Sequence, residues 1–314
     1  MRKLNVGGQA VIEGVMMKSE NKVAVAVRKP NKEIDLNKRN LNSWVRKKGL
    51  NNIPFIRGSF ILIESMLDGV RSLNYSAEFF EEDEEEPSKF DEFLNNIFKE
   101  KTNDVIIYFS IFLSLIFSVG LFILLPTFLG GILKNFTQNI LILNLFEGII
   151  RILIFIGYVS LISMNNDIKR VFQYHGAEHK AIHCYEKNLP LDVDNARDFT
   201  TLHPRCGTNF MFIVMIVSML LFSLFGWPNP FLRMVYRLLC LPIVSGIAYE
   251  IIKVAGKYDN SFVKVLALPG MYLQKITTKE PDDEQLEVAL VALKAVIGDK
   301  ENGNDNKGDI DKVD

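Results

Sequence analysis

The sequence predicts a membrane α-helical protein with about four transmembrane helices, a small α+β cytoplasmic N-terminal part and a C-terminal amphipathic helix. Two stretches of the 314-residue chain, 105–133 and 206–232, contain no Asp, Glu, Lys or Arg. They are 29 and 27 residues long, whereas about 20 apolar residues are enough for a helix to cross a bilayer. These stretches nearly rule out a soluble globular protein and make the lipid bilayer the first expected partner.

Charge and cysteine content narrow the class further. The 36 Lys and Arg residues nearly balance the 37 Asp and Glu residues, so the net charge is −1. This balance argues against a nucleic-acid partner. Three cysteines are too few for a complete disulfide framework, and they indicate a reducing compartment.

The first two hydrophobic segments are each long enough to span a bilayer. We expect a helix over 105–125 that is ended by Pro126 and the Gly130-Gly131 pair, because proline interrupts a helix. The second segment, 140–164, is apolar except for Glu147 and Arg151. These two residues are four apart and can neutralise each other inside a bundle as an internal ion pair. Intramembrane charges also mark ion pathways, which is the alternative interpretation.

The third and fourth segments form a predicted helical hairpin. They cover 210–227 and about 231–255, and a short turn with two prolines joins them. The fourth segment carries Arg233 and Arg237, whose side chains we expect to snorkel toward one membrane face. Cys240, in the middle of this segment, is expected to be a small buried apolar side chain.

The distribution of Lys and Arg predicts the orientation of the chain. Seventeen precede the first span, six lie in the connection 165–208, and eight follow residue 255. The connection 126–139 contains only Lys134. Connections rich in Lys and Arg stay in the cytoplasm, so we expect both termini and 165–208 on the cytoplasmic side.

The segments outside the spans complete the predicted organisation. An alternating β-branched run at 23–28, a turn and 33–36 predict a β-hairpin, and helical spacing over 58–75 predicts an amphipathic helix docked on the membrane core or its surface. A second amphipathic helix is expected over 282–296. The expected divisions are an N-terminal region (1–77), an acidic linker (78–103), a transmembrane core (104–256), a C-terminal segment and helix (257–298), and a disordered tail (299–314).

All four histidines of the chain lie within 29 residues of the cytoplasmic connection. A helix is predicted over 170–187, and His175, His179 and His183 follow at i, i+4 and i+8, so they share one helical face. Three turns span ~12 Å, which is too far for all three to bind one ion on a straight helix. We therefore expect two helix histidines and one ligand from elsewhere to bind a divalent transition metal, of which zinc is the expected one.

The loop 203–207 is the expected source of that last ligand, because its proline and glycine allow the chain to fold back. The first hypothesis combines His175 and His179 with His203 or Cys206. A register in which His179 and His183 bind the metal is nearly as good. A structural polar network without metal, and acid/base chemistry without metal, are the two remaining alternatives.

The run 175–179 also has the spacing H-x-x-E-H. In this pattern two histidines bind zinc and the glutamate activates water. Glu178 is therefore the candidate catalytic base.

Several stretches of the chain resemble a known family. The resemblance rests on residues 7–17, 54–58, 174–180, 203–208 and 280–287. As a set they resemble the YqhQ-type family of bacterial integral-membrane proteins of unknown function, which are often labelled metal-dependent enzymes. The resemblance implies a multi-pass protein of the bacterial plasma membrane with a presumed metal site, and it names no substrate.

Three further carboxylates are candidates. Glu13 lies in an apolar run bracketed by glycines, and a buried carboxylate needs a partner or a metal. It is a candidate for the missing ligand or base, unless it reaches solvent or pairs with an arginine. Glu64 and Asp68 share a helical face and could serve acid/base chemistry. The alternative is a solvated face or ion pairs with Arg57 and Arg71.

These observations favour a membrane-embedded metal-dependent hydrolase or transferase with its site at the cytoplasmic membrane face. The position of the site suggests a lipid, a lipid-linked or a membrane-peptide substrate. The main alternative is a non-enzymatic accessory or scaffold protein of a membrane complex for insertion or envelope assembly, in which the histidine cluster is structural. A transporter is the third hypothesis, and only the Glu147 and Arg151 pair supports it.

Overall fold

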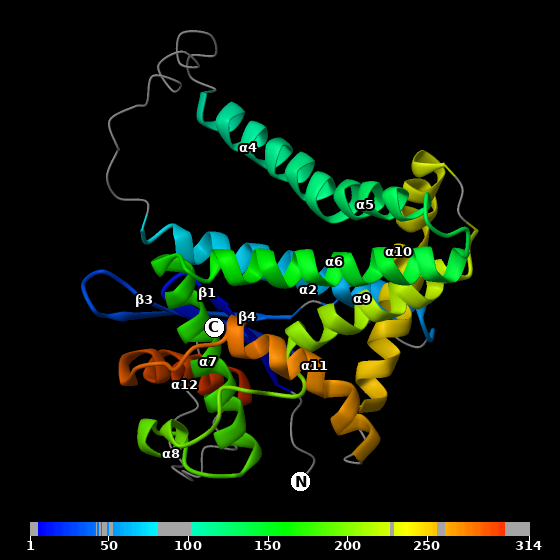
Figure 1. The fold of residues 1–314 in the computed structure, drawn as a ribbon. Helices are drawn as coiled ribbons and strands as arrows, with labels where there is room; N and C mark the ends of the chain where they lie inside the picture. The colour runs from blue at the N-terminus through cyan, green and yellow to red at the C-terminus, as the bar shows by residue number, and fades with distance from the viewer. Residues whose placement is uncertain are drawn as a thin grey trace.

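The fold is mostly helical, with a small antiparallel sheet near the N-terminus (Figure 1). The predicted acidic stretch at 81–101 and the tail at 299–314 fall outside the residues that the computed structural model describes. The described residues are 6–41, 43, 45, 49, 53–80, 102–226, 229–255 and 261–298.

The sheet has four antiparallel strands in the order β1-β2-β3-β4. Two residues connect β1 to β2, and Glu13 in this turn has a positive φ of 48°. The hairpin predicted from the alternating run is formed by β3 and β4. The strands are β1 (Gly7–Val11), β2 (Gly14–Lys18), β3 (Lys22–Arg28) and β4 (Ile34–Asn40).

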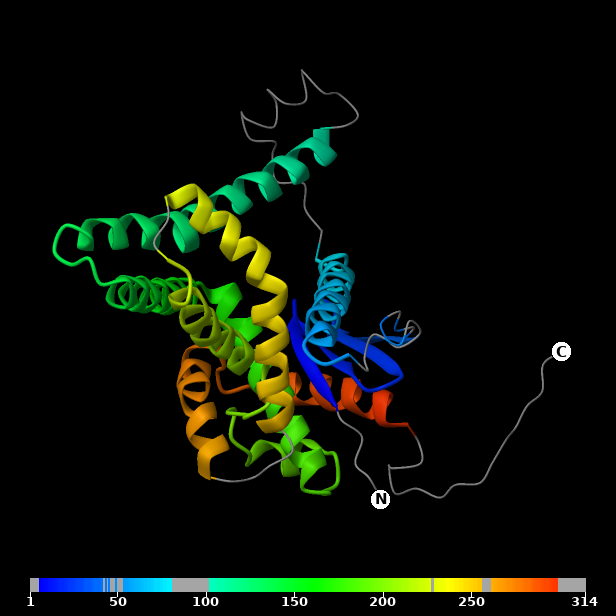
Figure 2. The same cartoon turned by 90° about the vertical axis from the view of Figure 1, so that its right-hand side faces the viewer.

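Both faces of the sheet are covered, which explains the alternation of valine and alanine in β3. Ala24 and Ala26 face a core shared with α7 (Asn166–Glu186) and α12 (Asp283–Ile297). Alternate residues of β3 face Tyr75, near the end of α2 (Ile56–Ala77). Figure 2 shows the sheet between α2 and α12. This small core holds one side of α7 in place.

Helix α12 is well defined by its own ends. Asp282 and Gln285 form a reciprocal capping box at its N-terminus, where each side chain bonds the other residue's backbone N–H. Its buried residues include Leu286, Ala289, Leu290, Leu293 and Val296.

Among the described residues, three helices are long and apolar enough to cross a membrane: Phe112–Leu133, Ile140–Ile162 and Phe231–Val254. The third predicted segment, α9 (Gly207–Ser223), is apolar, but with 17 residues it is shorter than these three candidate spans. The three candidate spans lie in α4 (Thr102–Val119) with α5 (Leu125–Leu133), in α6 (Ile140–Ile162) and in α10 (Pro230–Ala255). The described residues also include α8 (Val193–Arg197) and α11 (Ser261–Thr277).

The prediction that the first span ends at Pro126 is wrong, because the helix continues to Leu133. A π-helical turn, η3 (Gly120–Leu124), joins α4 to α5, and Pro126 lies in the first turn of α5. Proline fits the first turn of a helix because its missing N–H is not needed there.

The apolar helices do not form a simple parallel bundle. Helices α9 and α10 pack through Ile213, Val217, Val244 and Ala248, and α6 and α9 are also in contact. In both views α10 crosses α6 steeply instead of running beside it (Figures 1 and 2).

Helix α2 docks on α10 with the face that carries its small and polar residues. Arg57 Nε donates to Glu250 Oε1 at 2.6 Å, and Ser59 donates to the Pro242 carbonyl at 2.6 Å. Small and polar residues of α2 face inward because they permit close approach and pair with neighbouring strands. The buried residues are Gly58, Asp68, Gly69, Ser72 and Ser76, whereas Ile63, Met66, Leu67, Val70 and Leu73 are exposed.

Candidate metal centre

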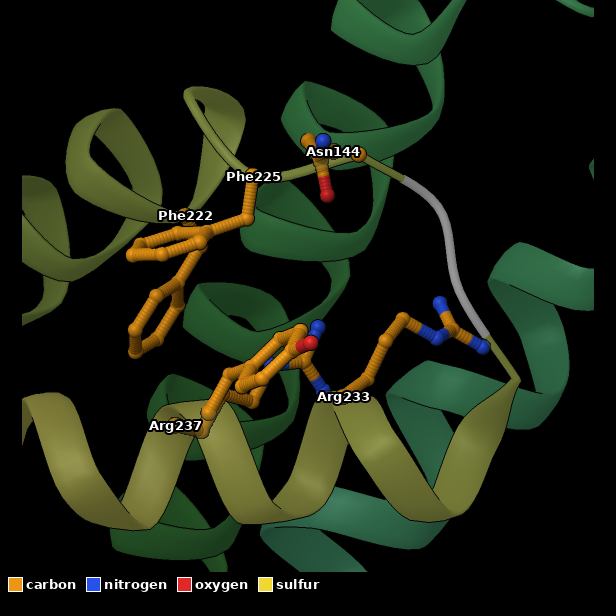
Figure 3. Close-up of a pocket in the computed structure, with 7 residues that line it drawn as sticks. Asn144, Phe222, Phe225, Arg233 and Arg237 are labelled. Atoms are coloured by element: carbon orange, nitrogen blue, oxygen red, sulfur yellow. The ribbon is translucent and has the colours of Figure 1, made fainter.

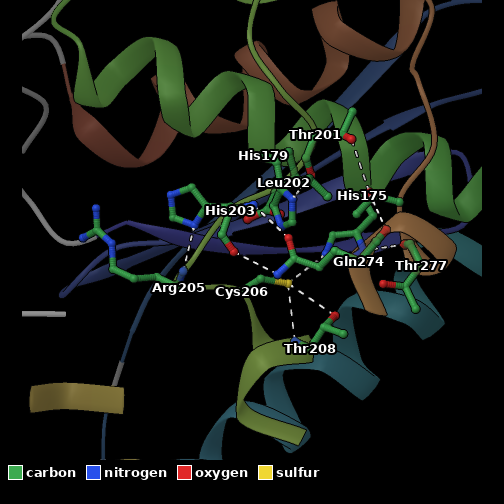
Figure 4. A network of polar contacts seen from close by, with 12 residues as sticks. His175, His179, Thr201, Leu202, His203, Arg205, Cys206, Thr208, Gln274 and Thr277 are labelled. Atoms are coloured by element: carbon green, nitrogen blue, oxygen red, sulfur yellow. Dashed lines mark hydrogen bonds and ion pairs between the residues drawn. The ribbon is translucent and has the colours of Figure 1, made fainter. Parts of the chain in front are cut away.

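Helix α7 carries His175, His179 and His183, and it is held by a cap at its N-terminus and by a core on one side. Asn165 caps its N-terminus by accepting hydrogen bonds from the Asp167 and Ile168 N–H groups. Tyr174 and Ala181 pack into the core shared with the sheet and α12. The histidines lie on another side, toward the loop that precedes α9 and the end of α11 (Figure 4).

Two backbone carbonyls orient the first two imidazoles. His175 Nδ1 lies 2.9 Å from the Thr277 carbonyl, and His179 Nδ1 hydrogen-bonds the Thr201 carbonyl. Because a carbonyl oxygen only accepts, each Nδ1 carries the proton and each Nε2 presents a lone pair. This arrangement is the usual way in which proteins orient a metal-binding histidine.

The two Nε2 atoms and Cys206 Sγ lie close together. His175 Nε2 is 3.2 Å from Cys206 Sγ, and the three possible ligand atoms are all within 4.8 Å of one another. His179 Nε2 is buried and has no hydrogen-bond partner among the described residues. Burial lowers the pKa of His179, so this imidazole is held in the neutral form that binds metals.

Cys206 reaches the histidines because it is the N-cap of α9. Its Sγ accepts a hydrogen bond from the Thr208 N–H at 3.4 Å. The positive end of the α9 dipole therefore faces the sulfur. The thiol is half-buried.

His183 and His203 belong to a second group with Glu186, and their possible ligand atoms are also within 4.8 Å of one another. His183 Nε2 donates to the Leu202 carbonyl at 2.9 Å. Glu186 forms an ion pair with Arg205 and lies 3.4 Å from His203 Nε2. The structure thus places His203 with His183 and Cys206 with His175 and His179, and Arg205 supplies positive charge at the second group.

Glu178 is buried beside the first group. Its Oε2 lies 3.4 Å from His179 Nε2. Burial raises the pKa of this carboxyl group, while the nearby His175 and His203 and a hydrogen bond from the Gly8 N–H lower it. A carboxylate with a raised pKa next to possible metal ligands is typical of a proton-accepting group.

Two glycines permit this arrangement. A Cβ on Gly8 would lie 2.7 Å from Glu178 Cγ, and a Cβ on Gly176 would lie 2.1 Å from the Lys279 carbonyl oxygen. Gly8 also lines a groove of about 380 Å³ next to Gly7, Gln9 and Ser65. The glutamate is therefore in contact with a residue that borders open space.

The other candidate carboxylates have structural partners. Glu13 pairs with Arg170 and accepts a hydrogen bond from Tyr174 at 3.2 Å, so it is not aimed at the histidines. Asp68 pairs with Lys18 at 2.8 Å and Arg39 at 3.2 Å, not with the arginines expected for it.

Glu64 accepts a hydrogen bond from the Ser43 hydroxyl at 3.0 Å. Cys240 is buried, as the sequence analysis expects.

The charges predicted in the second span form a larger cluster than expected. Arg151 lies 3.2 Å from Glu147, as the sequence analysis predicts. Arg233 and Arg237 also point inward to Glu147, at 3.1 and 2.5 Å, so the prediction that they snorkel is wrong. A fully buried carboxylate attracts every cation within reach.

The contacts that sequence analysis missed come from backbone atoms and glycines. No side-chain property marks the carbonyls of Thr201 and Thr277 as partners of the imidazoles. Gly8 and Gly176 lie in two of the stretches on which the family resemblance rests, which was the one available signal.

Comparison with known proteins gives a family and one relative of high coverage. Residues 53–299 match the profile of a family described as "Protein of unknown function (DUF1385)". The chain is 37% identical over 300 residues to a Bacillus subtilis (strain 168) protein described as "Uncharacterized protein YqhQ", covering 93% of this chain and 92% of the relative. No solved structure matches the chain.

Proposed function

The chain belongs to the DUF1385 family, and on that premise we propose that it is a metal-dependent hydrolase or transferase of the bacterial plasma membrane. Its site is formed by His175, His179, Cys206 and Glu178 at the cytoplasmic face. The family itself assigns no activity, so the proposal stands on the residues of this chain.

One observation carries the proposal: two carbonyl-oriented imidazoles and a thiol converge, and one of the imidazole nitrogens is buried without a partner among the described residues. An unsatisfied buried nitrogen is costly, and a metal ion satisfies it. Two histidines and one cysteine are a donor set that zinc accepts with a further position open for chemistry.

In this scheme His175 Nε2, His179 Nε2 and Cys206 Sγ would hold a divalent ion. Such an ion, when bound, supplies Lewis acidity and lowers the pKa of water to about 7. Thr277 and Thr201 fix the imidazole tautomers. Glu178 accepts the proton at its buried carboxylate, and its raised pKa makes it a better base than an exposed glutamate.

The proposed topology has four spans, with α9 paired with α10 as the second hairpin. Both termini and the connection 165–208 then lie in the cytoplasm, as their excess of Lys and Arg favours. An acidic linker at 78–103 leads from the N-terminal part into the membrane core. A site at the headgroup level suits a lipid, a lipid-linked or a membrane-peptide substrate.

A structural role is the second candidate, and the burial of the cluster favours it. His179 and Glu178 are 1% and 4% exposed. In this case the cluster only fastens the connection 165–208 to α11, and the protein is an accessory or scaffold of a membrane complex for insertion or envelope assembly.

Three variants distinguish the two roles: Glu178→Gln, His179→Ala and the control Glu186→Gln, whose carboxylate belongs to the second group. Metal content, melting temperature and complementation of a deletion strain are measured for each. If the protein is an enzyme, the Glu178→Gln variant should keep its metal and its stability but should not complement the deletion strain. The His179→Ala variant should lose both its metal and complementation.

If the cluster has only a structural role, a variant should lose complementation only when it also loses metal or stability. If Glu178→Gln behaves like the control in all three measurements, the site has no base and the enzyme proposal is rejected.

A further inference from the structure

We propose that a second, cationic pocket between α6, α9 and α10 binds the headgroup of an anionic phospholipid. Asn144, Phe222, Phe225, Gly226, Arg233, Tyr236 and Arg237 line this pocket (Figure 3). It lies at the end of α9 opposite to Cys206, about 25 Å away along a helix of 17 residues. The pocket is therefore separate from the histidine cluster, and the inference does not depend on a metal.

The first argument is charge. Within 140–164 and 206–249 the sequence contains one acidic residue and three arginines. All three arginines contact Glu147, whose side chain is 1% exposed. The four side chains together carry a charge of +2, and positive charge at membrane depth needs an anion. Glu147 neutralises one of the three positive charges, and an anion would balance the net charge that remains.

The second argument is an unsatisfied amide. Asn144 is 6% exposed, and its Nδ2 has no hydrogen-bond partner among the described residues. The side chain lines the same pocket as Arg233 and Arg237 (Figure 3). A buried amide N–H without an acceptor is costly. An anionic oxygen beside Asn144 Nδ2 would accept a hydrogen bond from the amide in the pocket that Arg233 and Arg237 also line.

The third argument concerns the shape and surroundings of the pocket. The space inside it that a water-sized group can occupy is about 10 Å³, which is room for a single oxygen-sized group. One phosphoryl oxygen therefore enters while the rest of the headgroup stays at the mouth. Phe225 and Tyr236 stack there with centroids 5.8 Å apart, and Leu224 and Phe231 are largely exposed. These apolar side chains suit acyl chains and do not suit a soluble anion.

Binding is tested on the full-length protein in detergent, by native mass spectrometry with dioctanoyl phosphatidylglycerol and dioctanoyl phosphatidylcholine. We expect phosphatidylglycerol to bind at least tenfold more tightly. Arg237→Gln should weaken its binding about tenfold or more, because a charge-assisted hydrogen bond is lost. Lys134→Gln removes an exposed positive charge from the α5–α6 connection and should change nothing.

Arg237→Gln also removes a partner of Glu147 and could prevent folding, so Asn144→Leu is the second variant. It keeps the size and charge of the site, and it should weaken phosphatidylglycerol binding about three- to tenfold with an unchanged melting temperature. The proposal is overturned if both lipids bind equally, or if Asn144→Leu and Lys134→Gln behave alike. Displacement of phosphatidylglycerol by equimolar inorganic phosphate would overturn the assignment to a lipid.

Discussion

Replacing Gly176 by alanine places a methyl group against the chain segment that orients His175. The new Cβ would lie 2.1 Å from the Lys279 carbonyl oxygen and 3.1 Å from Thr201 Cγ2. Ordinary van der Waals contact begins at about 3.4 Å, so the Lys279 backbone must move by about 1.3 Å. Backbone at this position cannot rotate away as a flexible side chain could.

The displacement acts on two hydrogen bonds of this segment. The Lys279 N–H donates to the Phe172 carbonyl at 2.9 Å, and His175 Nδ1 donates to the Thr277 carbonyl at 2.9 Å. Losing both costs about 2 kcal/mol, and overpacking adds about 1–3 kcal/mol. Alanine in a helix returns about 1 kcal/mol relative to glycine. The expected net loss of stability is about 2–4 kcal/mol.

Thermal unfolding and zinc titration of the purified protein test this reasoning. A loss of that size lowers the melting temperature by roughly 5–15 °C, and the loss of a carbonyl that orients a ligand weakens zinc binding about 10–100-fold. Gly207→Ala is the matched control, since this glycine follows Cys206 directly and no atom lies within 4 Å of its added Cβ. If Gly176→Ala melts and binds zinc like this control, the packing of 277–279 on α7 is not as described.

Three further predictions concern the metal site, the proposed topology and the contact between Glu178 and β1. Protein purified without a histidine tag should contain about one transition-metal ion per chain, and His179→Ala should contain none; metal-free wild-type protein after reconstitution would refute the site. Asn188→Cys in an otherwise cysteine-free chain should resist membrane-impermeant maleimide in intact cells, and its labelling would place the connection outside the cytoplasm. Gly8→Ala should displace Glu178, so this variant should keep its metal and fail to complement a deletion strain. Gly7→Ala should complement like the wild type, because its added Cβ meets no atom of a non-adjacent described residue within 4 Å. Equal complementation by the two variants would show that Glu178 does not pack against β1.

The periodicity of the sequence was sufficient to place His175, His179 and His183 on one face of a helix, because spacing alone determines which residues share a helical face. It could not decide between His203 and Cys206 as the loop ligand. That choice depends on how the loop enters α9, where Cys206 becomes the N-cap. The direction of each imidazole depends on the carbonyls of Thr201 and Thr277, which no residue type reveals.

The fold shows the same division between local pattern and long-range contact. The β3–β4 hairpin and the helix over 58–75 could be predicted, because alternation and helical spacing are local properties. The contacts of the polar face of α2 could not, because the close approach of Gly58 to α10 and the ion pair of Asp68 with Lys18 join residues far apart in the sequence. The inward direction of Arg233 and Arg237, which are expected to snorkel toward one membrane face, could not be predicted because nothing in their own helix indicates the buried Glu147.

The core that holds α7 is assembled from three segments that leave the ribosome at very different times. The sheet is made first, α7 follows after two apolar helices, and α12 emerges 97 residues after the end of α7. At roughly 5–20 residues per second this interval is about 5–20 s. Until then Val15, Met17 and Ala26 lack the helix that covers them, so the newly made chain needs protection from aggregation. The carbonyl of Thr277 is made only shortly before α12, so His175 gains this hydrogen-bond partner after α4, α5, α6, α9 and α10 have been made.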